Sequence, residues 1–146
     1  MTAVEPMAAA TARLRAAGLR VTAQRIALLM AVDESPGHAD AETLRQVAGR
    51  VTGGLSLQAT YNVLRALVDA GLVRCTLIPG HAGRYETECG DNHHHFVCRS
   101  CGSIRNVKCA VGRAPCLDPD LPDTYSVDEA AVTFWGRCPD CAVAAD

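Results

Sequence analysis

The sequence predicts an α+β protein in which an N-terminal winged helix-turn-helix domain precedes a smaller domain built from short strands. The first half of the 146 residues places apolar side chains at helical spacing between capping residues and glycines, and then becomes strand-like. From Asp91 the composition changes to short apolar runs broken by histidine, cysteine and proline. The boundary is therefore expected between Glu88 and Asn92, which gives domains of residues 1–88 and 89–146.

Four helices are expected in the first half, each marked by a residue that caps it or a glycine that ends it. Residues 7–17 are rich in alanine, arginine and leucine and stop at Gly18. Three later helices begin after side chains that can accept a hydrogen bond from the first helical turn, namely Thr22, Asp40 and Ser56. Glycines end the last two of these helices, at Gly53–Gly54 and at Gly71.

Two strands are expected after the helices, over residues 72–78 and 84–87, because the turn-forming sequence PGHAG lies between them. Helices followed by a β-hairpin are the outline of a winged helix. Residues 114–123 contain three prolines and are not expected to form a long helix. The second half is otherwise expected to supply short strands within residues 93–98, 103–109 and 125–135.

The charge of the chain is unevenly distributed. Formal net charge is −2, which by itself suggests no nucleic-acid partner. No acidic residue occurs from Pro6 to Val32 or from Thr43 to Val68, and these two stretches contain seven arginines. The part from Cys89 onward has five basic and eight acidic residues. A basic first half favours a polyanionic partner for that half alone.

The N-terminus does not resemble a signal peptide, because Arg13 and Arg15 interrupt its apolar run. No run approaches the roughly 18 apolar residues of a membrane span. A cytoplasmic protein with no membrane partner is therefore expected. In that reducing compartment, Cys-x-x-Cys pairs indicate metal ligands or redox groups before they indicate disulfides.

Two Cys-x-x-Cys pairs form the strongest motif. Thirty-six residues separate the pairs, and each pair has a glycine or proline in or beside its turn. Two such turns can supply the four thiolates of a tetrahedral Zn²⁺ site, whereas buried free thiols or a redox dithiol would not need two pairs of equal spacing. The sequence predicts a structural zinc held by Cys98, Cys101, Cys138 and Cys141.

Three consecutive histidines precede the first of these pairs. In a strand, side chains alternate, so His93 and His95 share one face and His94 points the other way. His93 and His95 can therefore bind one metal, although a polar surface stretch is the plain alternative. The nearest further ligands are Glu86 and His38, but His38 taken alone would be interpreted as a solvated loop residue.

The segment after Ser56 has the pattern of a recognition helix, with a polar first turn, an apolar end and a strand behind it. The side chains expected to reach bases or phosphates of double-stranded DNA are Gln58, Thr60, Tyr61, Asn62 and Arg65. An ordinary amphipathic surface helix is the alternative, and the surrounding arginines favour DNA.

The motifs together resemble the ferric uptake regulator (Fur) family of metal-dependent repressors. The resemblance rests on GLRVTAQR, TYNVLRALVDAGLV, RYE, HHHFVCRSCG and the closing GRCPDC. It implies an N-terminal winged-helix DNA-binding domain, a small C-terminal α/β dimerisation domain and a homodimer on a DNA operator. It also implies structural Zn²⁺ on the four cysteines and a regulatory Fe²⁺ or Mn²⁺ bridging the two domains.

The resemblance also assigns roles to individual residues. His38, Glu86, His93 and His95 match the family's regulatory ligands, and Arg20 and Tyr61 match DNA-contacting positions. Two positions depart from the family pattern. Asn62 stands where most members have arginine. Asn106 stands where the family has an acidic fifth ligand, so its contribution to the regulatory site is open.

The variant motifs resemble most closely the actinobacterial, peroxide-responsive branch, which implies control of catalase genes with hydrogen peroxide as the signal. One alternative is an iron- or zinc-uptake repressor without peroxide sensing, with Cys89 joining His93 and His95 in the zinc case. A thiol switch on Cys109 and Cys116 is another, less favoured than two buried thiols. A zinc hydrolase is disfavoured, because no general base stands out beside the histidines. The protein is not expected to be an enzyme.

Overall fold

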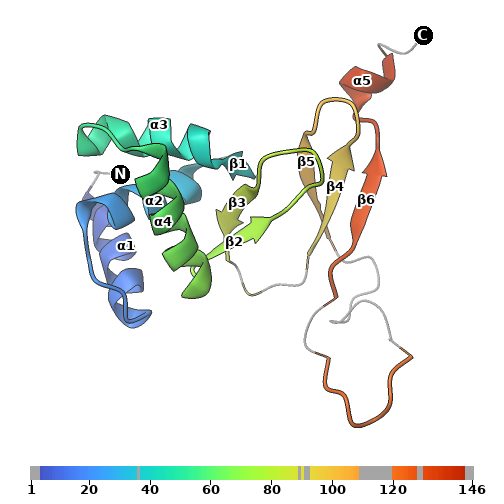
Figure 1. Cartoon of the computed structure of the whole chain (residues 1–146), viewed down its shortest axis with the longest axis horizontal. Coiled ribbons are helices and arrows are strands. Elements are labelled where there is room, and N and C mark those ends of the chain that lie inside the picture. The colour runs from blue at the N-terminus through green and yellow to red at the C-terminus, as the bar shows by residue number, and fades with distance from the viewer. Residues whose placement is uncertain are drawn as a thin grey trace. The chain divides into compact units, whose positions relative to one another are not determined.

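The computed structural model describes residues 4–35, 37–88, 90, 93–108, 120–127 and 130–143 (Figure 1). The chain divides into two compact units, Met1–Cys89 and Gly90–Asp146. Within the described residues, no helix is long and apolar enough to cross a membrane.

Four helices make up most of the first unit: α1 (Val4–Ala16), α2 (Ala23–Glu34), α3 (Ala41–Thr52) and α4 (Leu57–Asp69). The three expected N-caps are confirmed. The side chain of Thr22 accepts from the backbone N–H of Arg25, and those of Asp40 and Ser56 accept from the third residue after them. Gly53 ends α3 in the left-handed conformation, with φ of 76°. The first helix begins three residues earlier than expected.

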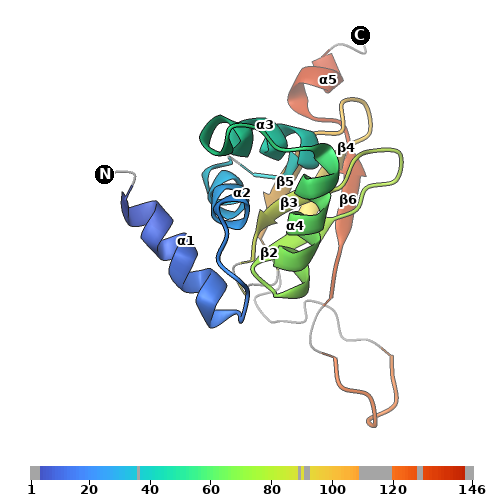
Figure 2. The same ribbon diagram turned by 60° about the vertical axis from the view of Figure 1, so that its left-hand side comes forward.

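A three-stranded antiparallel sheet completes the first unit, in the order β1-β3-β2. The expected hairpin consists of β2 (Val73–Thr76) and β3 (Arg84–Thr87), with Cys75 opposite Tyr85. The third strand, β1 (Ala39–Asp40), was not expected, because two residues are too few to show alternation. Helix α4 packs against β2, so recognition helix and hairpin lie side by side (Figures 1 and 2). The winged helix is confirmed.

One apolar core holds these helices and the hairpin together. Its fully buried side chains come from every helix and from β2, and include Leu14, Leu28, Leu29, Leu44, Leu64, Leu67 and Val73. On α4 the buried residues are Thr60, Leu64 and Leu67, which lie on one face at helical spacing. The opposite face of α4 therefore stays exposed.

The second unit contains a separate three-stranded sheet of order β5-β4-β6. Strand β4 (His94–Cys98) pairs antiparallel with β5 (Ile104–Val107) and parallel with β6 (Thr133–Gly136). Within the described part of the expected strand region 125–135, only the end is a strand. A short helix, α5 (Pro139–Val143), follows and was not expected. Most of the proline-containing stretch 114–123 lies outside the described residues, and its described part, 120–123, is not helical.

Replacing Leu64 by alanine should lower the free energy of unfolding by about 2–5 kcal/mol, because the side chain is fully buried between helices and leaves a cavity. Val51→Ala on α3 is the control, since Val51 is 76% exposed, and should change stability by less than about 0.5 kcal/mol. Denaturant unfolding followed by far-ultraviolet circular dichroism measures both. Equal losses in the two variants would contradict this description of the core.

Candidate metal centres and nucleic-acid interface

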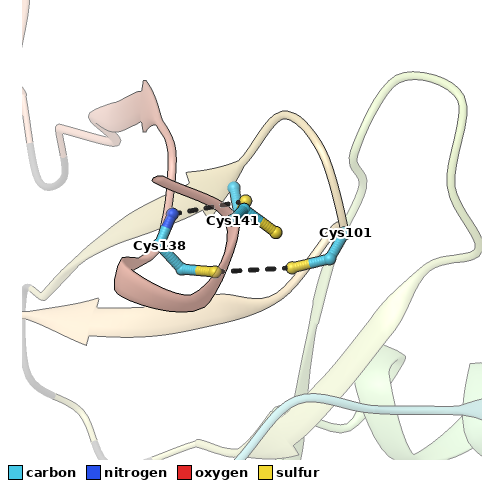
Figure 3. Close-up of side chains that lie close together, drawn as sticks. Cys101, Cys138 and Cys141 are labelled. Atoms are coloured by element: carbon cyan, nitrogen blue, oxygen red, sulfur yellow. Dashed lines mark hydrogen bonds between the residues drawn. The ribbon is translucent and has the colours of Figure 1, made fainter. Parts of the chain in front are cut away.

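Four thiols meet at one end of the second unit. Cys98 ends β4, Cys101 lies in the turn that follows, Cys138 precedes α5, and Cys141 lies within it. Their sulfur atoms all lie within 4.8 Å of one another. Figure 3 shows the sulfurs of Cys101 and Cys138 facing each other, and they are 3.7 Å apart. The parallel pairing of β6 with β4 brings the two pairs together across the intervening residues.

The spacing of these sulfurs fits Zn²⁺. A tetrahedral zinc with Zn–S bonds of about 2.3 Å requires sulfurs about 3.8 Å apart, whereas a disulfide bond is about 2.05 Å long. The five cysteines of the described residues are all unbridged. The donor set, four soft sulfur ligands with no position left for substrate, is that of a closed structural site.

Hydrogen bonds to two of the four thiols favour their ionised, thiolate form. The backbone N–H groups of Cys101 and Cys138 lower the pKa of Cys98 to about 6. The Cys138 N–H lies 3.4 Å from the Cys98 sulfur. A hydrogen bond of 3.2 Å with the Ser103 hydroxyl lowers the pKa of Cys101. In contrast, the sulfurs of Cys138 and Cys101 raise the pKa of Cys141 to about 12. Four negative charges cannot accumulate here without a cation, which is what zinc supplies.

The histidines of the second unit lie at the start of β4. The ring centroids of His93 and His95 are 5.0 Å apart in an edge-to-face arrangement, as expected for side chains two residues apart on one face. His94 and His95 are buried. Asn106 on β5 lies directly opposite His95 in the antiparallel register and therefore projects from the same face of the sheet.

A second set of donors lies in the first unit. Nε2 of His38 is 3.6 Å from Oε2 of Glu86 on β3, and both side chains are more than nine-tenths buried. Two ligands about 2.2 Å from one ion and 3.6 Å apart would subtend about 110°, which a divalent metal accepts. The interpretation of His38 as a solvated loop residue is wrong, because its side chain is buried.

The backbone of His38 is also unusual. Its φ of 48° makes it the one residue other than glycine with positive φ among the described residues. This left-handed conformation is uncommon for a side-chain-bearing residue, and such strain is concentrated at functional sites. Sequence reasoning did not foresee it, although the preceding Pro-Gly in SPGH indicates a tight turn.

The exposed face of α4 carries most of the residues expected to contact DNA. Gln58, Tyr61, Asn62 and Arg65 are exposed, and so is Arg20 before α2. Thr60 was wrongly assigned to this surface. Its side chain is fully buried, and its hydroxyl donates to the backbone carbonyl of Ser56. Thr60 therefore stabilises the start of α4 from inside.

Among the described residues, one cysteine lies outside the four-thiol cluster. Cys75 on β2 is half-buried opposite Tyr85, and burial raises the pKa of its thiol. It is therefore a protonated, weakly nucleophilic group at neutral pH. The cysteines named in the alternative hypotheses, Cys89, Cys109 and Cys116, lie outside the described residues.

Comparisons with known proteins agree with this architecture. The profile of the ferric uptake regulator family matches residues 16–111. The transcriptional regulator FurA of Mycobacterium tuberculosis is 51% identical over 131 residues, covering 90% of this chain and 88% of that protein. The structure of the Helicobacter pylori ferric uptake regulator Fur superposes with a TM-score of 0.71 at 16% identity, covering 97% of this chain and 95% of that one. At 16% identity, this structural similarity is evidence for a shared fold alone.

A peroxide-responsive relative is more distant. The peroxide-responsive repressor PerR of Staphylococcus aureus is 28% identical over 131 residues, covering 89% of this chain and 87% of that protein. The resemblance to a peroxide sensor is thus weaker than the resemblance to FurA.

Replacing Cys98 or Cys138 by serine should abolish zinc binding, because three thiols leave the tetrahedral shell open and a structural zinc supplies folding free energy. Purified protein should fall from about one tightly held zinc per chain to nearly none and should lose its dimeric state. Metal analysis and analytical ultracentrifugation measure these changes.

The matched control is Cys75→Ser, which removes a half-buried thiol far along the chain from either pair and should leave zinc content unchanged. Full zinc content in both Cys98→Ser and Cys138→Ser would contradict the four-cysteine site.

Proposed function

The chain belongs to the ferric uptake regulator family of metal-dependent transcriptional regulators, and on that premise we propose that it represses transcription from a DNA operator in the cytoplasm. It is a regulator and not an enzyme. The observation that carries the proposal is that a chain with a winged helix also contains two donor sets of different chemistry. Four thiols form one set, and buried imidazole and carboxylate groups form the other.

DNA binding by the first unit is supported by charge and by exposure. The two stretches without acidic residues, 6–32 and 43–68, cover α2 except for its last two residues and α4 except for its last residue, and they contain seven arginines. The exposed face of α4 presents amides, a phenol and a guanidinium, which are groups that contact base edges and phosphates. In a winged helix this element is the one that enters the major groove.

A homodimer is supported by the edge strand of the second unit. Strand β6 pairs with β4 on one side, and in the described residues no strand pairs with its other edge. Phe134 and Trp135 point to opposite faces of β6 and remain 49% and 39% exposed. An edge strand with exposed aromatic side chains is a surface that proteins usually cover. A second copy of this chain is the proposed cover.

The proposed regulatory site uses His38 and Glu86 from the first unit and His93, His95 and Asn106 from the second. Nitrogen and oxygen ligands favour Fe²⁺ or Mn²⁺, whereas the thiols favour Zn²⁺. A metal held by both units binds best to one arrangement of the two, so it can shift the protein toward a form in which two recognition helices fit successive major grooves. The size of this effect equals the difference in metal affinity between the arrangements.

Hydrogen peroxide is the proposed signal. Fe²⁺ held by these ligands would activate peroxide by lending it one electron and would regain that electron from the attacked ring, so that the histidine supplies both electrons. The ring of His93 or His95 gains one oxygen atom at a carbon, and the second peroxide oxygen leaves as water, so that histidine is oxidised and peroxide reduced. An oxidised imidazole is a poorer metal ligand. The two units then lose the shared ligand set, and DNA is released.

A DNA-binding titration tests the function directly. The probe is a duplex selected from a randomised library by the Mn²⁺-loaded protein. Binding should be weak for the protein with zinc alone and tight with Mn²⁺ or Fe²⁺. Peroxide should release DNA from the Fe²⁺ form but not the Mn²⁺ form, with one added oxygen on the peptide that contains His93 and His95. An Fe²⁺ form that ignores peroxide would indicate an iron sensor, and selective activation by added Zn²⁺ would indicate a zinc-uptake repressor.

Replacing Arg20 by alanine should weaken binding to all duplexes and reduce the salt dependence of binding by about one unit of slope for each subunit of the proposed dimer whose Arg20 contacts one phosphate. Fluorescence anisotropy across a salt series measures the slope. An unchanged slope would remove Arg20 from the backbone contacts.

Tyr61→Ala should weaken operator binding by about tenfold, because it removes a 45% exposed ring from the face of α4, while metal content and dimerisation stay intact. Tyr125→Ala in the second unit is the control, since Tyr125 is 64% exposed and should leave DNA affinity unchanged. Equal affinities of the two variants for the operator would contradict the assignment of Tyr61.

Asn106→Asp should tighten Mn²⁺ binding about ten- to a hundredfold. It adds a negative ligand opposite His95, and each tenfold step corresponds to about 1.4 kcal/mol. DNA binding should then begin at a lower Mn²⁺ concentration. Isothermal titration calorimetry measures the metal affinity. If both affinities stay at the wild-type value, Asn106 lies outside the ligand shell.

A further inference from the structure

We propose that Asn62, held in position by Gln58, reads an adenine in the major groove of the operator. This inference rests on the proposed function, because it assumes that α4 enters the groove. It goes beyond that function by assigning a base preference to two residues that the family resemblance leaves without one.

The two amides form a single unit on the surface of α4. Nε2 of Gln58 donates a hydrogen bond of 3.1 Å to Oδ1 of Asn62, one helical turn further along. Both side chains are exposed and belong to the first two turns of the helix. In helix-turn-helix proteins, the N-terminal residues of the recognition helix contact base edges. The amides therefore lie where bases would be read.

The hydrogen bond between the amides orients Asn62. Because Oδ1 accepts from Gln58, rotation of the amide is restrained, and Asn62 presents the two protons of Nδ2 and the second lone pair of Oδ1. Adenine offers an acceptor at N7 and a donor at N6, which match one amide donor and one amide acceptor. Guanine offers two acceptors, N7 and O6, so the amide oxygen would face another oxygen.

The surroundings of the amide pair suit an A·T pair in particular. Gln58 and Asn62 line a hollow of about 580 Å³ between α4 and the β2–β3 hairpin, which gives a base edge room to approach. Apolar groups line the same hollow, including Leu77, which is 81% exposed, and Tyr61. The thymine paired with adenine carries a methyl group in the major groove that prefers apolar contact. Arg65, one turn beyond Tyr61, can reach a phosphate.

The test compares DNA selected from a randomised duplex library by the Mn²⁺-loaded, full-length wild type and three variants. Wild type should select an adenine in each half-site, and its replacement by guanine should weaken binding on the order of ten- to a hundredfold. Asn62→Arg should select guanine at that position, because a guanidinium fork supplies two donors. Asn62→Ala should accept any base there.

Gln58→Ala tests positioning. It should keep adenine as the preferred base but reduce the discrimination several-fold, because Asn62 can then turn its amide. Gln46→Ala on α3 is the matched control, an exposed amide that contacts Glu42 instead and should leave the selected sequence unchanged. Thermal melts of each variant show that it is folded.

The inference is overturned if Asn62→Ala and wild type discriminate equally at every base pair, or if Asn62→Arg keeps the wild-type preference. Failure of the proposed function would give a different result, because the Mn²⁺-loaded wild type would then select no duplex at all.

Discussion

The cluster of four thiols is the constraint on which the second unit depends. Among its described residues only Val97 and Cys98 are fully buried apolar side chains, so the β5-β4-β6 sheet has little core of its own. Small domains in that position rely on a metal or a disulfide for stability. The sulfurs tie the turn after β4 to the segment after β6, and β6 is the strand proposed to meet the second copy. Loss of zinc is therefore expected to disturb both the sheet and the proposed dimer surface.

The first unit has the opposite character. Its helices and hairpin enclose a continuous apolar core, and burial of apolar surface stabilises a fold without a metal. Its buried polar pair, His38 and Glu86, is therefore available to the proposed regulatory site. Burying an imidazole and a carboxylate costs free energy, and a left-handed backbone at His38 adds strain. A stable core can sustain both, and a bound divalent metal would offset them. Separating the stabilising metal from the regulatory one lets the regulatory site be weak and reversible.

Features that depend on residues close together in the sequence could be predicted, whereas features that depend on packing between distant segments could not. Helix starts at Thr22, Asp40 and Ser56 were correct because a cap is a contact between residues three apart. The four-cysteine cluster was also predictable, because two Cys-x-x-Cys pairs together supply a tetrahedral set of soft sulfur ligands. Thr60 was assigned to the wrong face, since the buried side of α4 is chosen by packing against the core. The burial of His38 likewise depends on the hairpin, which is distant in sequence.

Stepwise addition of Co²⁺ to metal-free, reduced protein, with absorption and operator binding recorded together, tests the separation of the two sites most directly. The first equivalent should give intense sulfur-to-metal charge-transfer bands of tetrahedral thiolate coordination without DNA binding. The second should add only the weak bands of nitrogen and oxygen ligation, and DNA binding should rise with it. DNA binding complete at the first equivalent, or new thiolate bands at the second, would contradict two sites with separate roles.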